Sequence, residues 1–142
     1  MDLYARRFAR MSLVWLTLGA MLGTHLGLAA HHYEVIRFVH VHVLLAGFMA
    51  MMIFAVGYHI LPRFNAVPVA HPWLIPVHFW AANLGLAGMI LFYVFGQGLG
   101  FGPHGIGFGL SGGLEALSIF LFVFNLWPVL AGPKDEAAPV TI

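Results

Sequence analysis

The sequence contains no cysteine and very little charge. Six lysines and arginines and five acidic residues make only 8% of its 142 positions charged, against about 25% in typical soluble domains. Without cysteine, the chain cannot form a disulfide, a zinc–thiolate site, an iron–sulfur cluster or a covalent c-type haem attachment. Six basic residues and a net charge of +1 argue against a nucleic-acid partner. Any metal must therefore be held by histidine, methionine, carboxylate or backbone atoms.

Apolar residues make up 61% of the chain and gather in four long segments. These run over about residues 8–30, 36–61, 73–95 and 113–130, each near the roughly 20 residues that cross a bilayer. In lipid such segments must be helical, because an open strand leaves backbone groups unpaired. The links are short, so successive helices are antiparallel neighbours. The sequence predicts an all-α integral membrane four-helix bundle over residues 1–132, with a disordered tail at 133–142.

Positive charge predicts how this bundle is oriented. Apart from Arg37, at the start of the second segment, the basic residues are Arg6, Arg7, Arg10, Arg63 and Lys134. The positive-inside rule then places both termini in the cytoplasm and the links 31–35 and 96–112 outside. We expect a bacterial-type inner membrane. The first segment lacks an A-x-A cleavage site, which favours a spanning helix over a removable signal peptide. The glycine-dense link 96–112 predicts an external loop without regular structure.

Nine histidines are an excess in so apolar a chain. In the predicted orientation the outer half holds His25, His31, His32, His40, His42 and His104, and the inner half holds His59, His71 and His78. A lone histidine in a membrane helix often only hydrogen-bonds a neighbouring helix. For the inner three, that role and a second metal site are the two alternatives. His31 and His32 either lie in a solvated turn at the membrane surface or lie beside the carboxylates of a cofactor. We expect His104 to be solvated.

The second segment carries the best candidates for binding a haem. His40 and His42 lie about 200° apart around a helix, so both cannot coordinate one iron across a porphyrin plane. The second axial ligand must come from His25 or from a second copy of the protein. Arg37 lies one turn outside His40, where it can pair with haem propionates. Gly47 continues the face of His40 and gives a flat patch for a ring.

Two other features of the chain are open to a functional or a structural interpretation. Gly19, Gly23 and Gly27 form a small-residue stripe that lets another helix approach closely. Glu115 is a carboxyl inside an apolar segment, which is expensive enough to suggest a function. It is expected within one turn of the interface, where simple solvation is the alternative. Met49, Met51 and Met52 are interpreted as packing residues or as copper ligands.

The second segment also resembles a known family. RFVHVH followed by LLAGF and GYHILPRF resembles the second transmembrane helix of the haem–copper oxidase subunit I superfamily, nearest to nitric oxide reductase and cbb3-type catalytic subunits. The resemblance implies that His40 is an axial ligand of a low-spin haem b on the outer side, with Arg37 beside it. His42 stands where asparagine or threonine is common in the longer subunits. The chain looks like a short four-helix subunit I-like protein.

The resemblance covers only part of the larger fold, which has about a dozen helices. The helices with the copper ligands and the other haem ligands have no counterpart, so complete oxidase or reductase activity is not implied. We therefore predict a homodimeric membrane protein that binds b-type haem for electron transfer or for gas or redox sensing. Respiratory electron carriers or oxidase subunits are its expected partners. The alternatives are a copper or haem handling protein for oxidase assembly and a structural subunit without a cofactor.

Overall fold

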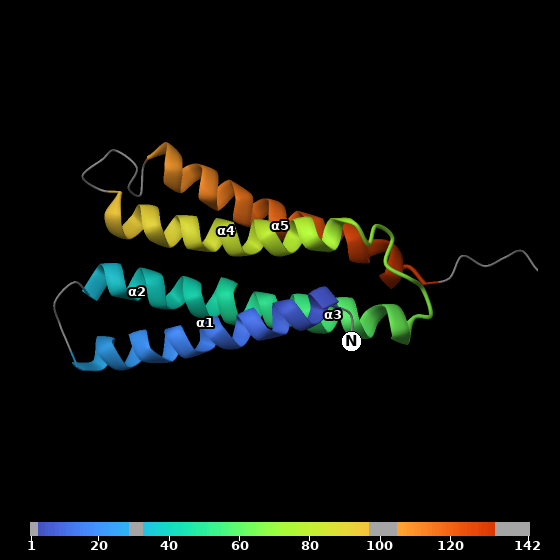
Figure 1. The fold of residues 1–142 in the computed structure, drawn as a ribbon, viewed down its shortest axis with the longest axis horizontal. Coiled ribbons are helices and arrows are strands. Elements are labelled where there is room, and N and C mark those ends of the chain that lie inside the picture. The colour runs from blue at the N-terminus through green and yellow to red at the C-terminus, as the bar shows by residue number, and fades with distance from the viewer. Residues whose placement is uncertain (1–2, 29–32, 97–104, 133–142) are drawn as a thin grey trace, which may run out of the picture.

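The computed structural model describes residues 3–28, 33–96 and 105–132, and within them every regular element is a helix (Figure 1). The elements are α1 (Leu3–Leu28), α2 (Tyr33–His42), the π-helix η1 (Val43–Ala50), α3 (Met51–Phe64), α4 (Leu74–Phe95) and α5 (Ile106–Leu130). α2, η1 and α3 follow one another without a break, so Tyr33–Phe64 forms one rod of 32 residues. The described residues thus contain four helices long and apolar enough to cross a membrane. The predicted all-α fold with four such helices is confirmed.

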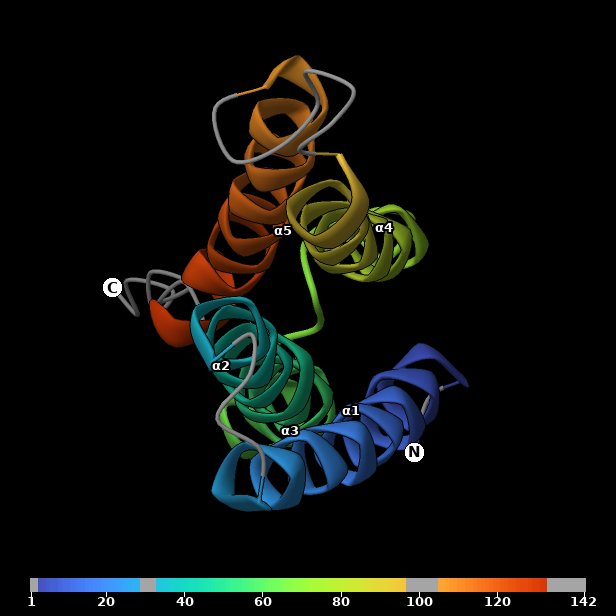
Figure 2. The ribbon, with the colours of Figure 1, turned by 90° about the vertical axis from the view of Figure 1, so that its left-hand side faces the viewer.

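The helices form two antiparallel pairs that lie side by side. α1 packs along the rod made by α2, η1 and α3, and α4 packs along α5. Contacts of α4 with η1, and of α3 with α5, join the two pairs, while α1 and α5 lie on opposite sides (Figure 2). α1 begins and α5 finishes at the same end of the bundle, which we call the terminal end (Figure 1). Residues 29–32, 97–104 and 133–142, including the predicted tail, lie outside the described residues.

Large apolar side chains cover the outside of the bundle. Met21 is 65% exposed, Phe120 70% and Trp127 71%, and many others are about half exposed. Water would make a surface of this kind aggregate, whereas lipid is as apolar as the side chains themselves. The buried share of each membrane-length segment is only 11% to 39%. Together with the helix lengths, this surface indicates an integral membrane protein.

The last helix begins earlier than the sequence predicts. α5 starts at Ile106, so the prediction of an unstructured link over residues 106–112 is wrong. The glycines of this stretch allow the helix to lie close to α4. A Cβ on Gly107 would come within 2.9 Å of the Phe92 ring, and one on Gly88 within 2.4 Å of the Ser111 hydroxyl. Close packing, and the need to pair every backbone group in lipid, outweigh the roughly 1 kcal/mol that each glycine costs a helix.

Close packing inside the bundle is concentrated towards the terminal end. The core there consists of aromatic and aliphatic side chains from all four membrane-length helices: Phe8, Met51, Phe54, Ala55, Tyr58, Phe79, Ala82, Leu126 and Val129. Phe8 is fully buried and contacts Phe54, Tyr58 and Phe79 with ring centroids 5.1 to 6.2 Å apart. This end therefore holds the pairs together.

The middle of the second rod is a π-helix, which the sequence does not predict. η1 spans eight residues, Val43–Ala50, immediately after His42. π-helical turns are rare, and they occur frequently at functional sites. Gly47 lies in the middle of η1, and a Cβ on it would come within 2.6 Å of the Trp15 ring and 3.0 Å of Leu86. The absence of a side chain at Gly47 therefore lets α1 and α4 both reach η1.

Asn125 fixes the link between the two pairs to α5. Its Oδ1 accepts a hydrogen bond from the His71 N–H at 2.8 Å, and its Nδ2 donates to the His71 carbonyl at 3.0 Å. Since Asn125 is fully buried, Asn125→Ala leaves two backbone groups without partners and is expected to cost about 2–3 kcal/mol. Thermal unfolding of the purified protein in detergent measures this. Asn65→Ala is the control, because that side chain makes no hydrogen bond within the described residues, and equal losses would contradict the role of Asn125.

Candidate functional site

His40 lies against the small-residue stripe of α1. Its Nδ1 is 2.9 Å from the Gly19 carbonyl oxygen, and a Cβ on Gly23 would come within 2.9 Å of its Cε1. Because a carbonyl oxygen only accepts, Nδ1 carries the hydrogen and donates. In the neutral ring Nε2 is then the nitrogen with the free lone pair. Nε2 has no hydrogen-bond partner in the described part of the chain, and it is not among the buried side-chain atoms without partners.

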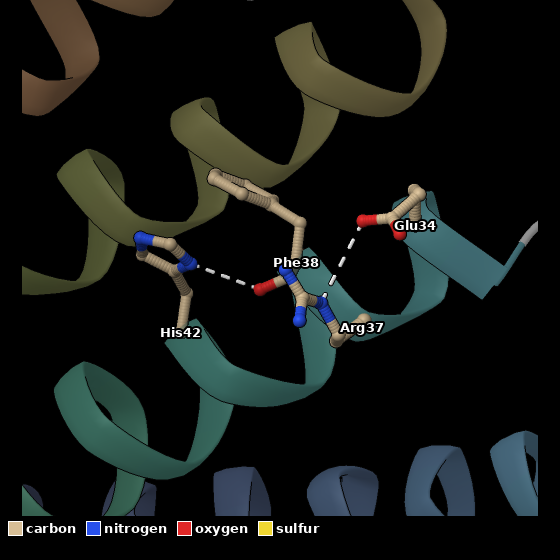
Figure 3. A network of polar contacts seen from close by, with 4 residues as sticks. All are labelled: Glu34, Arg37, Phe38 and His42. Carbon is tan, nitrogen blue, oxygen red and sulfur yellow. Dashed lines mark hydrogen bonds and ion pairs between the residues drawn. The ribbon is translucent and has the colours of Figure 1, made fainter.

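His42 faces α4 instead of α1. Its Nδ1 donates to the Phe38 carbonyl at 2.9 Å, within its own helix (Figure 3). The ring of His42 packs on the Phe38 ring with centroids 4.0 Å apart. Phe38 in turn stacks on Tyr93 of α4 at 3.7 Å and an interplanar angle of 11°. His40 therefore contacts α1, whereas His42 packs on Phe38 on the side of α4, and one iron cannot bind both within one chain.

The other residues proposed for the haem site are more widely spread. Arg37 forms an ion pair with Glu34 at 3.6 Å, and its side chain is 59% exposed (Figure 3). The Trp15 ring covers the face of Gly47 that was expected to receive a cofactor ring. His25 is exposed on α1. It is two residues from Gly23, so it points about 200° away from the side that contacts His40.

The histidines near the terminal end occupy three separate environments. The Arg63 guanidinium donates to the His59 carbonyl and lies 2.8 Å from His59 Nδ1. The His71 ring stacks on Phe124 with centroids 5.2 Å apart. His78 is fully buried, and its Nδ1 is 3.0 Å from the Tyr58 hydroxyl. Within the described residues no group of three or more histidines and carboxylates is placed to hold a metal ion, and His31, His32 and His104 lie outside them.

Glu115 lies farther from the start of its helix than the sequence predicts. It is nine residues beyond Ile106, about 13 Å along α5, and it is only 9% exposed. Glu115 therefore does not lie within one turn of the start of its helix, because α5 begins seven residues earlier than predicted. The buried positions of α5, among them Ser111, Ser118 and Asn125, recur at helical spacing with Glu115. This polar stripe was detectable from the sequence once the start of the helix was known.

No protein-family model, curated protein or solved structure matches this chain. The likeness to haem–copper oxidase subunit I thus rests on the sequence patterns alone. His40 and His42 both have the tautomer that a metal ligand requires, since each Nδ1 donates to a carbonyl, and only the acceptor of His40 belongs to a neighbouring helix.

Proposed function

We propose that this protein binds b-type haem through His40 and uses it for electron transfer or for sensing a gas or a redox state. The hydrogen bond from His40 Nδ1 to the Gly19 carbonyl is the observation that supports this best. A ligating histidine nearly always donates its other ring N–H to such an acceptor, which fixes the tautomer and makes the ligating nitrogen more basic. The sequence contains no cysteine, so the haem would be held without covalent attachment.

The residues around His40 fit one side of a haem. His40 Nε2 would bind the iron, and Arg37 would meet the propionates. Arg37 now pairs with Glu34 at an exposed site, where an ion pair contributes only about 0–1 kcal/mol, so the exchange of partners costs little. Since Trp15 covers Gly47, residues of α2 and not of η1 would hold the haem. Bound haem supplies a one-electron couple, and this chain's residues hold and orient it.

A second copy of the chain would supply the other axial ligand. His42 faces α4, and His25 points away from His40, so neither reaches the free side of His40 in its own chain. His25 is exposed on α1 and is the histidine best placed to reach a neighbouring protomer. A bis-histidine iron in a homodimer carries electrons, whereas an iron with an open position binds oxygen or nitric oxide.

The cellular setting follows from charge and composition. With the arginines of residues 6–10 and Arg63 at the terminal end, both termini lie in the cytoplasm. The haem then lies near the outer face of a bacterial-type inner membrane, where respiratory electron carriers or oxidase subunits are the partners. The alternative functions are copper or haem handling during oxidase assembly and a structural role without a cofactor.

The absorption spectrum of the detergent-purified protein tests the proposal. Expression with sufficient haem is expected to give a Soret band and, after reduction, sharp α and β bands of a b-type haem. Dissociation of all the haem into acidified acetone confirms that it is not covalently bound. A colourless protein that contains copper would favour metal handling. A protein without either metal, after the same expression, would contradict haem binding and favour the structural role.

A further inference from the structure

A groove runs along the outside of the bundle where α3 meets α5. Its volume is about 390 Å³, within the usual range of ligand-binding clefts. Its walls include the exposed apolar side chains of Ile53, Val56 and Ile60 on α3. The groove extends from Met52 to Leu61, about 14 Å along the helix. It therefore lies inside the membrane-length part of the rod and opens onto the lipid.

Phe122 lines the groove from α5 and limits its width. Its ring contacts Phe54 and Tyr58 of α3, with centroids 4.7 and 5.4 Å apart. A Cβ on Gly57 would come within 2.8 Å of the same ring, so the two helices already touch along this line. A further helix about 10 Å across and 14 Å long occupies roughly 1,100 Å³, which is far more than the groove holds. A flexible hydrocarbon chain fits this space better than a helix does.

The terminal end of the groove carries a positive charge. Arg63 lies one turn beyond Ile60 and two turns beyond Val56, so the three side chains follow one side of α3. The guanidinium donates to the His59 carbonyl and lies 2.8 Å from His59 Nδ1. Since His59 is three residues from Val56, this contact keeps the guanidinium on the side of the groove. Arg63 is exposed and lies one residue before the end of the membrane-length rod.

Tryptophans mark the same level as the place of the lipid headgroups. Trp73 directly precedes α4, Trp127 lies three residues before the end of α5, and both are exposed at the terminal end. Tryptophan is enriched at headgroup level on both sides of a membrane. Arg63 is thus at the height of the lipid phosphates, and the groove continues from there into the hydrocarbon.

We propose that this groove binds one anionic phospholipid, with an acyl chain between α3 and α5 and the phosphate on Arg63. This inference does not depend on haem. Lipid tails are as apolar as the groove, so the chain gains only packing over the surrounding bilayer. Discrimination between lipids therefore comes from the headgroup, whose phosphate oxygens the guanidinium holds through paired N–H groups. The choline ammonium of a zwitterionic lipid would bring a second positive charge to the same place.

A bound lipid would also join the two helix pairs. α3 and α5 belong to different pairs, and their contact is among those that hold the pairs together. An acyl chain with Ile53 and Ile60 on one side and Phe122 on the other adds a contact across this joint. A ligand that binds only the folded state stabilises it by mass action. Anionic lipid is therefore expected to raise the unfolding temperature more than zwitterionic lipid with the same chains.

Native mass spectrometry of the delipidated protein in detergent tests the headgroup site. Phosphatidylglycerol and phosphatidylcholine with identical acyl chains are added in equal amounts. One basic residue at the membrane surface is expected to give the wild type a preference of about fivefold for phosphatidylglycerol. Arg63→Gln keeps a polar side chain without the charge and should bind both lipids equally. Arg10→Gln is the control, because it removes an exposed arginine of α1 near the same end and should keep the preference.

Val56→Trp tests the groove itself. The indole occupies the space of the acyl chain from an exposed position, so bound lipid of both kinds should fall to the background level. Val77→Trp is the matched control, since it makes the same change at an exposed position of α4 near the same end and outside the groove. It should bind lipid as the wild type does. If Val56→Trp does not fold, Ile60→Trp fills the same groove and replaces it.

The outcomes separate the headgroup site from the groove. Equal binding of the two lipids by the wild type, or a preference that survives in Arg63→Gln, overturns the phosphate site. Unchanged lipid binding in Val56→Trp overturns the groove. A mass of two chains without lipid, reduced to one chain by Val56→Trp, would assign the groove to a second copy of the protein and overturn the lipid as its occupant.

Discussion

Replacement of His40 by alanine is expected to abolish haem binding. The imidazole provides the only proposed iron ligand whose second nitrogen is held by a neighbouring helix, through the Gly19 carbonyl 2.9 Å away. Removing it takes away the iron–nitrogen bond and leaves the apolar surface of α1 in its place. The haem content per protein, measured from the Soret band after purification, should fall to background. The fold should survive, because His40 is only half-buried.

His42 gives the control for this variant. It belongs to the same short helix and its Nδ1 hydrogen is likewise committed to a carbonyl, but its ring packs against Phe38 and the α4 side. His42→Ala is therefore expected to retain haem. Free imidazole should restore the Soret band in His40→Ala, since it fits the space left beside Gly23. A normal spectrum in His40→Ala without added imidazole would overturn the ligand assignment.

The same measurement identifies the second ligand. If His25 of another protomer completes the coordination, His25→Ala should convert a six-coordinate spectrum into a five-coordinate one and open the iron to carbon monoxide. Loss of the six-coordinate form in His42→Ala instead would assign that role to His42 of the second copy. A six-coordinate spectrum in both variants would exclude both side chains as the distal ligand.

The sequence predicts the helices well because membrane crossing is a local property. Length and apolar composition alone require a helix, so the segments around Trp73–Phe95 and Ile36–Leu61 appear close to where they were expected. The start of α5 was misplaced because glycine is a poor helix former on its own. Only contact with α4, as between Gly107 and Phe92, makes it favourable there, and such contact is not visible in a single segment.

The candidate site is less predictable, since it depends on which helices meet. Helical spacing alone separates His40 from His42. Helical spacing does not predict that Trp15 of α1 covers Gly47 or that η1 is a π-helix. The depth of Glu115 followed the error in the start of α5. The pairing of His78 with Tyr58, from different membrane-length helices, likewise requires the three-dimensional arrangement.

The contact between α4 and α5 at Gly85 is expected to tolerate no side chain. A Cβ there would lie 2.7 Å from the backbone nitrogen and 3.0 Å from the Cα of Glu115. Backbone atoms cannot rotate away as a side chain does, so Gly85→Ala must push the helices apart. We expect a strain of about 3 kcal/mol, reduced by the roughly 1 kcal/mol that alanine gains over glycine in a helix. The net loss of about 2 kcal/mol should appear as a lower unfolding temperature in detergent.

Gly113→Ala is the matched control, because it makes the same chemical change on the facing helix. Nothing lies within 4 Å of a Cβ on Gly113, so only the helix propensity changes and the protein should gain up to about 1 kcal/mol. The same glycine-to-alanine substitution is therefore expected to lower the stability at position 85 and to raise it at position 113. Stabilisation by Gly85→Ala would show that α4 and α5 are farther apart than this contact requires.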